Sequence, residues 1–76
     1  MRTFYEVWDF ETRNQIAAFE SESDALAFFR KMLDLNGEAG VRELGLLRQD
    51  PDSFGEYAPT LVLDGARYLA QIAAHV

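Results

Sequence analysis

The sequence predicts a small α+β fold in which an antiparallel sheet packs on one long helix, with a short helix at the C-terminal end. Three observations predict it: an aromatic segment followed by a turn, a capped segment with apolar residues at helical spacing, and two later segments with β character. The expected order of elements is ββαββα. The 76 residues are too few for several domains, so residues 1–76 are taken as a single α+β domain.

Residues 3–20 are expected to form a β-hairpin. The first arm, from Phe4 to Phe10, is rich in aromatic residues and valine, which suit a pleated, half-buried surface. The tetrapeptide ETRN supplies the reversal, with Asn14 expected in the left-handed conformation. The return arm, QIAAFE, has weak strand propensity, so its assignment depends on pairing with the first arm.

The segment SESDALAFFRKMLDLNG predicts the long helix. Ser21 is expected to cap its start, with Asp24 three residues later as in a capping box, and Gly37 is the expected C-terminal stop. Apolar residues recur between them at helical spacing and cover about half of the circumference: Ala25, Leu26, Phe28, Phe29, Met32, Leu33 and Leu35. This apolar stripe is wider than one small sheet needs.

The second half of the chain predicts two strands and a tail with two interpretations. VRELGLLRQ alternates and reads as a strand, DPDSFGEYAP as a loop, and TLVL as a short strand. Asp64-Gly65 between apolar residues is typical of a hairpin turn. In contrast, ARYLAQIAAHV consists of helix formers, with Asp64 as the N-cap. The helix is favoured, and the hairpin stays open as the alternative for residues 60–76.

Composition excludes several function classes. The chain has no cysteine, which excludes disulfides and thiolate metal sites, and its only histidine, His75, stands beside the last residue. Thirteen acidic and seven scattered basic residues give a net charge of −6, so no nucleic-acid partner is expected. Because no apolar run is long enough for a signal peptide or a membrane span, we expect a cytoplasmic protein without a membrane partner.

Two patterns could indicate a metal site or a catalytic site, but each has a simpler explanation. Asp50-x-Asp52-x-x-Gly55 begins like a calcium loop, but Phe54 and Leu61 occupy positions that need oxygen ligands. Carboxylates near the hairpin and the helix start would permit acid–base chemistry, although a solvated acidic surface with helix capping explains them better: Glu6, Asp9, Glu11, Glu20, Glu22 and Asp24. We therefore expect no enzyme, no catalytic residues, no metal site and no cofactor.

The aromatic residues of the first strand are the strongest functional signal. Strand alternation places Tyr5 and Val7 on one face, and Phe4, Glu6, Trp8 and Phe10 on the other. Since Glu6 would be costly to bury, we expect Tyr5 and Val7 to face the long helix. The outer aromatic residues then stack bases, lie under the C-terminal helix, or pack against a second copy or another protein.

We expect the third of these. A core of this size is marginal, and without disulfides or a metal, oligomerisation is the remaining source of stability. The expected interface residues are the outer aromatic residues of the first strand and those apolar residues of the long helix that a small sheet does not need to cover: Phe4, Trp8, Phe10, Leu26, Phe28 and Leu35.

Two short motifs carry a family resemblance. YEVWDFETRN followed by SESDALAFFRKML resembles a group of small stand-alone bacterial proteins that begin with a Y-E-V-W-D hairpin and continue with an acidic-capped helix; that group is uncharacterised and implies no activity. More distantly, the hairpin, the Ser-x-x-Asp-Ala-Leu helix and the strand that follows are similar to HicB-like antitoxins. No residue role is transferred from either.

The expected function is therefore a small, acidic, non-enzymatic module for protein–protein interaction or regulation that forms a homodimer, with another protein as a further partner. The alternative is a nucleic-acid-mimicking or antitoxin-like protein that binds a basic partner through its acids.

Overall fold

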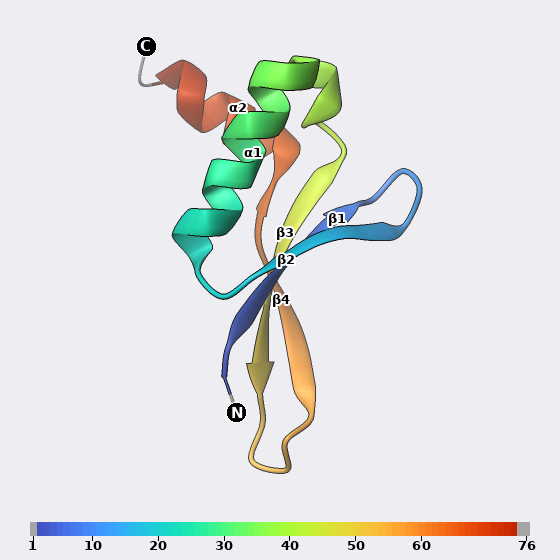
Figure 1. Cartoon of the computed structure of the whole chain (residues 1–76), viewed down its shortest axis with the longest axis vertical. Helices are drawn as coiled ribbons and strands as arrows, with labels where there is room; N and C mark the ends of the chain where they lie inside the picture. The colour runs from blue at the N-terminus through green and yellow to red at the C-terminus, as the bar shows by residue number, and fades with distance from the viewer. Residues whose placement is uncertain (1, 75–76) are drawn as a thin grey trace.

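The computed structural model describes residues 2–74, so His75 lies outside the described part. Its elements follow the order ββαββα with one short 3₁₀ turn, which confirms the predicted α+β fold (Figure 1). The strands are β1 (Phe4–Asp9), β2 (Asn14–Phe19), β3 (Leu44–Pro51) and β4 (Tyr57–Asp64). The helices are α1 (Glu22–Asn36), the 3₁₀ turn η1 (Glu38–Gly40) and α2 (Gly65–Ala74).

The four strands form one antiparallel sheet in the order β2-β1-β3-β4. β1 lies in the interior of the sheet, where Glu6 is paired with Leu47 of β3 and with Ala18 of β2. Leu47 is paired in turn with Leu61 of the edge strand β4. These pairings place four side chains in one row across the sheet.

The core lies between one face of the sheet and both helices. Among residues 2–74 it consists of eight buried residues: Val7, Ala25, Phe29, Val41, Leu44, Leu46, Leu63 and Tyr68. The ring of Phe29 from α1 meets that of Tyr68 from α2 edge-on, with centroids 5.2 Å apart. Both helices therefore pack on the same face of the sheet, and α2 does not cover the other one.

Local sequence signals explain where the helices begin and end. The Ser21 hydroxyl accepts a hydrogen bond from the Asp24 amide at 3.2 Å, and Gly37 ends α1 with φ 73°. The Asp64 carboxylate accepts from the Arg67 amide at 2.8 Å at the start of α2. This cap, together with the run of helix formers, confirms the favoured helix for the tail.

Three local details differ from the sequence-based expectation. In the first turn Arg13, and not Asn14, has the positive φ of 60°, so the reversal lies one residue earlier. The third strand begins at Leu44, because residues 38–43 form η1 and a turn in which Arg42 pairs with Glu38 at 3.9 Å. The fourth strand is longer than TLVL and includes Tyr57 and Pro59.

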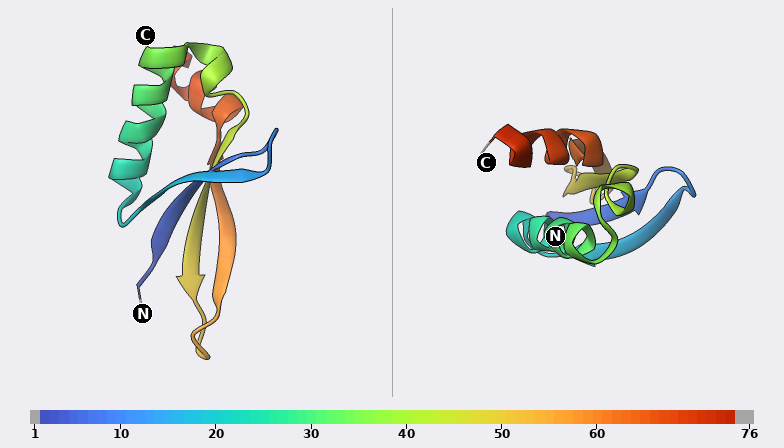
Figure 2. Two further views of the ribbon diagram at one scale, coloured as in Figure 1. Left: turned by 45° about the vertical axis from the view of Figure 1, so that its right-hand side comes forward. Right: turned by 90° about the horizontal axis from the view of Figure 1, so that it is seen from above.

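Part of the sheet extends beyond both helices. The start of β1, the end of β3 and the start of β4 project away from the helical end, and β3 and β4 are joined there by the loop of residues 52–56 (Figures 1 and 2). We call residues 2–6, 47–51 and 57–61 the ribbon. Within residues 2–74, neither helix has the length and apolar character needed to cross a bilayer.

Candidate protein-docking face

The face of the sheet opposite the helices is called the outer face. Strand alternation and cross-strand pairing define its members: Phe4, Glu6, Trp8, Phe10, Ala18, Leu47, Gln49, Pro51, Tyr57, Pro59 and Leu61. Three of its large apolar side chains are strongly exposed, with Leu61 at 53%, Phe10 at 44% and Tyr57 at 41%. No helix among the described residues packs on this face.

Contacts within the outer face hold its aromatic side chains in place. Phe4 meets Tyr57 edge-on with ring centroids 5.0 Å apart, which joins β1 to β4 across β3. The ring of Phe10 lies directly over Gly45, where an added Cβ would come within 2.1 Å of it. Because β3 offers only a hydrogen at this position, the sheet backbone can support the ring. The outer face is therefore ordered before any partner is bound.

Glu6 is the one carboxylate in the middle of the outer face. Its Oε1 atom accepts hydrogen bonds from the Gln49 amide at 2.7 Å and the Trp8 indole at 3.3 Å. Both donors are on one oxygen, and Oε2 has no donor among the described residues. Glu6 is half-buried, so the other carboxylate oxygen is free for a donor from outside the chain.

The opposite face of the ribbon is polar. Asp50 accepts from the Thr3 hydroxyl at 2.6 Å and from Arg48 Nε at 2.9 Å. The Thr3 hydroxyl, followed by the Arg48 guanidinium, lowers the pKa of Asp50 below its ordinary value. An exposed antiparallel sheet normally turns its polar side to water and its apolar side to the core. The ribbon thus presents an ion pair and hydroxyls beside Tyr5 on the helix side, and large apolar side chains around Glu6 and Gln49 on the outer face.

This hydrogen bond gives a pH-dependent contribution to stability. Because folding lowers the pKa of Asp50, its contribution is present above the unfolded value of about 3.9 and is lost as pH falls through the folded pKa. Thr3→Val removes the largest cause, so its urea midpoint should lie slightly below that of the wild type at pH 5 and converge with it near pH 2. The effect is small since the pair is solvent-screened.

Thr60→Val is the matched control for this measurement, because Thr60 lies on the same face of the ribbon and makes no side-chain hydrogen bond among those found for residues 2–74. A gap between wild type and Thr3→Val that stays constant from pH 5 to pH 2 would contradict the role of Asp50.

The loop of residues 52–56 is closed by its own hydrogen bonds. Asp52 Oδ1 accepts from the Phe54 amide at 2.8 Å and from the Glu56 amide at 2.9 Å. The Asp52 amide donates to the Glu56 carbonyl at 2.7 Å. The segment that begins like a calcium loop is thus a turn stabilised by an aspartate, with Phe54 89% exposed at its tip.

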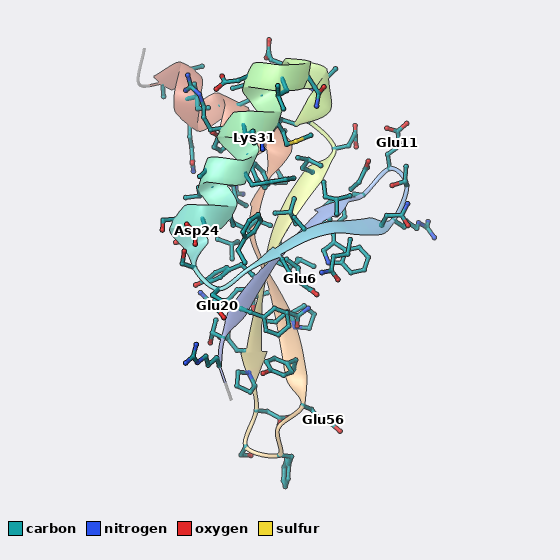
Figure 3. All side chains as sticks on the ribbon, viewed as in Figure 1. Glu6, Glu11, Glu20, Asp24, Lys31 and Glu56 are labelled. Carbon is teal, nitrogen blue, oxygen red and sulfur yellow. The ribbon has the colours of Figure 1, made fainter. Side chains whose placement is uncertain are left out.

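The carboxylates considered for acid–base chemistry are distributed among separate structural roles. Asp9 accepts from the amides of Glu11 and Thr12 in the first turn, and Glu20 lies 4.0 Å from Arg2. Figure 3 shows Glu11 at the tip of the β1–β2 turn, apart from Glu20 and Asp24 near the start of α1. Within residues 2–74, no three such side chains gather as a metal site would require.

The structure divides the expected interface residues between two locations. Phe4, Trp8 and Phe10 lie on the outer face, opposite Tyr5 and Val7, as the alternation predicts. Leu26 and Phe28 on α1 pack against the core, where Phe28 meets Phe19 with ring centroids 5.5 Å apart. Leu35, at the C-terminal end of α1, is 67% exposed.

Sequence reasoning missed the contribution of β3 and β4 to this face. Leu47, Tyr57, Pro59 and Leu61 surround Phe4 only because β3 and β4 pair beside β1. One local signal was present, because Leu61 and Leu63 alternate with Thr60 and Val62. However, a bulge lies between Leu61 and Leu63, so these two leucines point to opposite faces of the sheet and simple alternation assigns them to the same face.

Comparison of the chain with known protein families, curated proteins and solved structures finds no match. The resemblances to the Y-E-V-W-D proteins and to HicB-like antitoxins therefore stay predictions.

Proposed function

We propose that the chain is a non-enzymatic protein-interaction module that forms a homodimer through the outer face of its sheet. One observation carries this proposal: on the ribbon the Arg48–Asp50 ion pair and the Thr3 hydroxyl lie on the helix side, whereas the large apolar side chains Phe4, Tyr57 and Leu61 lie on the outer face, which no helix covers. That distribution is stable when the outer face is covered.

The size of the surface supports the same conclusion. A compact protein of 8.6 kDa exposes about 4,700 Å², whereas the accessible surface of this chain is 5162 Å². The excess is more than half of the about 800 Å² that each partner buries in a standard interface. With eight buried core residues and no cysteine, burial of this surface would also stabilise the fold.

The charge distribution permits two acidic chains to approach each other. Glu6 is the one acidic side chain among the residues of the outer face, Asp50 lies on the opposite face of the ribbon, and further acids lie at turns, helix ends and loop tips. Like-charge repulsion between two chains of net charge −6 is thus kept outside the contact and is screened beyond about 8 Å at physiological salt.

Sedimentation velocity over a micromolar concentration series tests the dimer. The wild type should have twice the mass of the 8.6 kDa chain. Leu61→Glu should be a folded monomer, because it places an unpaired charge within the apolar part of the contact. Leu35→Glu is the matched control: Leu35 is more exposed than Leu61 but lies on α1, so this variant should stay dimeric.

A wild type of 8.6 kDa throughout, or a dimeric Leu61→Glu variant, would contradict this assignment. If the chain is monomeric and instead binds a basic protein with an affinity that falls steeply with salt, the antitoxin-like alternative is favoured.

A further inference from the structure

We infer that the second copy packs face to face with its ribbon antiparallel to the first, so that Glu6 of each copy pairs with Arg2 of the other. The inference rests on the proposed homodimer and specifies its arrangement. The two-fold axis lies between the two sheets and follows the row of Phe4, Gln49 and Pro59.

The order of rows on the ribbon places the axis. The outer face of the ribbon has three successive rows: Glu6 with Leu47 and Leu61, then Phe4 with Gln49 and Pro59, then Pro51 with Tyr57. The middle row carries no charge. Rotation about it brings Leu61 of β4 over Tyr57 of the other copy, and these are the two most exposed large apolar side chains of the ribbon's outer face, at 53% and 41%. The face is then complementary to itself, as a two-fold interface requires.

The same rotation brings opposite charges together. Arg2 and Glu6 stand two residues on either side of Phe4 along one strand direction, so the axis exchanges their positions. The Arg2 carbonyl accepts a hydrogen bond from the Tyr57 hydroxyl at 3.2 Å, which fixes the backbone of Arg2 beside the outer face. The Arg2 side chain is 85% exposed and its guanidinium reaches Glu20 only at 4.0 Å, so it is free to change partner.

Glu6 has a carboxylate oxygen that could accept from this guanidinium. Both of its hydrogen-bond donors within the chain are on Oε1, and Oε2 is left for the guanidinium of the second copy. Arg2 and Glu6 of one chain are about 13 Å apart along the strand, at about 3.3 Å per residue, and they form no ion pair with each other: Arg2 lies beside Glu20, and Glu6 beside Trp8 and Gln49. The pair forms twice in the dimer by symmetry.

A parallel arrangement is less favourable. Rotation about an axis along the strands would bring the two loops of residues 52–56 together, and each carries the acids Asp52 and Glu56. Figure 3 shows Glu56 at this tip, far along the ribbon from Glu6. The antiparallel arrangement puts the two acidic tips at opposite ends and supplies Glu6 with a cation.

Charge reversal tests the arrangement directly. In a Glu6→Arg homodimer, the new arginine of each chain faces Arg2 of the other chain. In an Arg2→Glu homodimer, the new glutamate of each chain faces Glu6 of the other chain. The dissociation constant of each homodimer should therefore be about tenfold or more above that of the wild type. An equimolar mixture of the two variants has opposite charges at both contacts. Native mass spectrometry should therefore show the heterodimer as the dominant dimer. A statistical mixture, or heterodimers no tighter than the homodimers, would overturn the inference.

A second pair of variants tests the arrangement even if Glu6→Arg disturbs the fold by breaking the hydrogen bonds of Glu6 with Gln49 and Trp8. The chain has no cysteine, so single cysteines can be placed without background. A short bis-maleimide should join Leu61→Cys to Tyr57→Cys in a mixture, and each variant alone should cross-link poorly. Cross-linking of Leu61→Cys to itself that is as efficient as that of the mixture would overturn the inference while leaving the homodimer intact. A monomeric wild type would contradict both the homodimer and its antiparallel arrangement.

Discussion

Phe29→Ala should destabilise the protein by about 3–5 kcal/mol. Phe29 has no exposed surface and is the largest fully buried side chain. It joins both helices to the sheet through its contact with Tyr68 and the strand residues of the core. The total stability of a 76-residue domain is expected to be about 4–11 kcal/mol. The substitution therefore removes about a quarter or more of it and should lower the melting temperature by at least about 12 °C.

Urea and thermal unfolding at one fixed protein concentration measure this effect, because dimer formation makes apparent stability concentration-dependent. Phe54→Ala is the matched control: it makes the same chemical change at a side chain that is 89% exposed, and it should change stability by less than about 0.5 kcal/mol. Equal effects of the two substitutions would show that the core is not organised around Phe29.

Gly65→Ala should cost at least about 2 kcal/mol, although it replaces glycine by the best helix former at the start of α2. A Cβ atom at this position would lie 1.8 Å from the Val41 carbonyl oxygen and 2.8 Å from that of Arg42. Both obstacles are backbone atoms, so α2 must move away from the turn before β3. Circular dichroism during thermal unfolding should show a melting temperature lower by about 8 °C or more.

Ala66→Ser is the control for the position of α2, because Ala66 is the next residue along the helix and is exposed. Its effect should stay within about 0.5 kcal/mol. A stabilised Gly65→Ala variant would mean that α2 does not approach the turn of residues 41–43 as closely as the structure has it.

These two positions matter for the docking face even though neither lies on it. Phe29 and Gly65 hold both helices against one side of the sheet, which leaves the outer face uncovered. If α2 instead crossed to the other side, Phe4, Trp8 and Leu61 would be part of an ordinary core. The availability of the outer face for a second copy therefore depends on where α2 begins and on what its Tyr68 contacts.

The sequence by itself determined the elements whose signals are local. Ser21, Gly37 and Asp64 bound the helices through short-range hydrogen bonds and one positive φ, and these positions are as predicted. Alternation in β1 separated Tyr5 and Val7 from Phe4, Trp8 and Phe10, because side chains on a strand point to opposite faces in turn. The fold class followed from these elements.

Only the tertiary structure decided which surface is left open. The pairing of β3 and β4 beside β1 brings residues 47 and 57–61 next to Phe4, across more than forty positions of sequence that no local pattern connects. The contact of Tyr68 with Phe29 places α2 on the core side, which its helix propensity does not specify. Propensity and capping act within a few residues, whereas the identity of a sheet's covered face depends on packing between elements far apart in the chain.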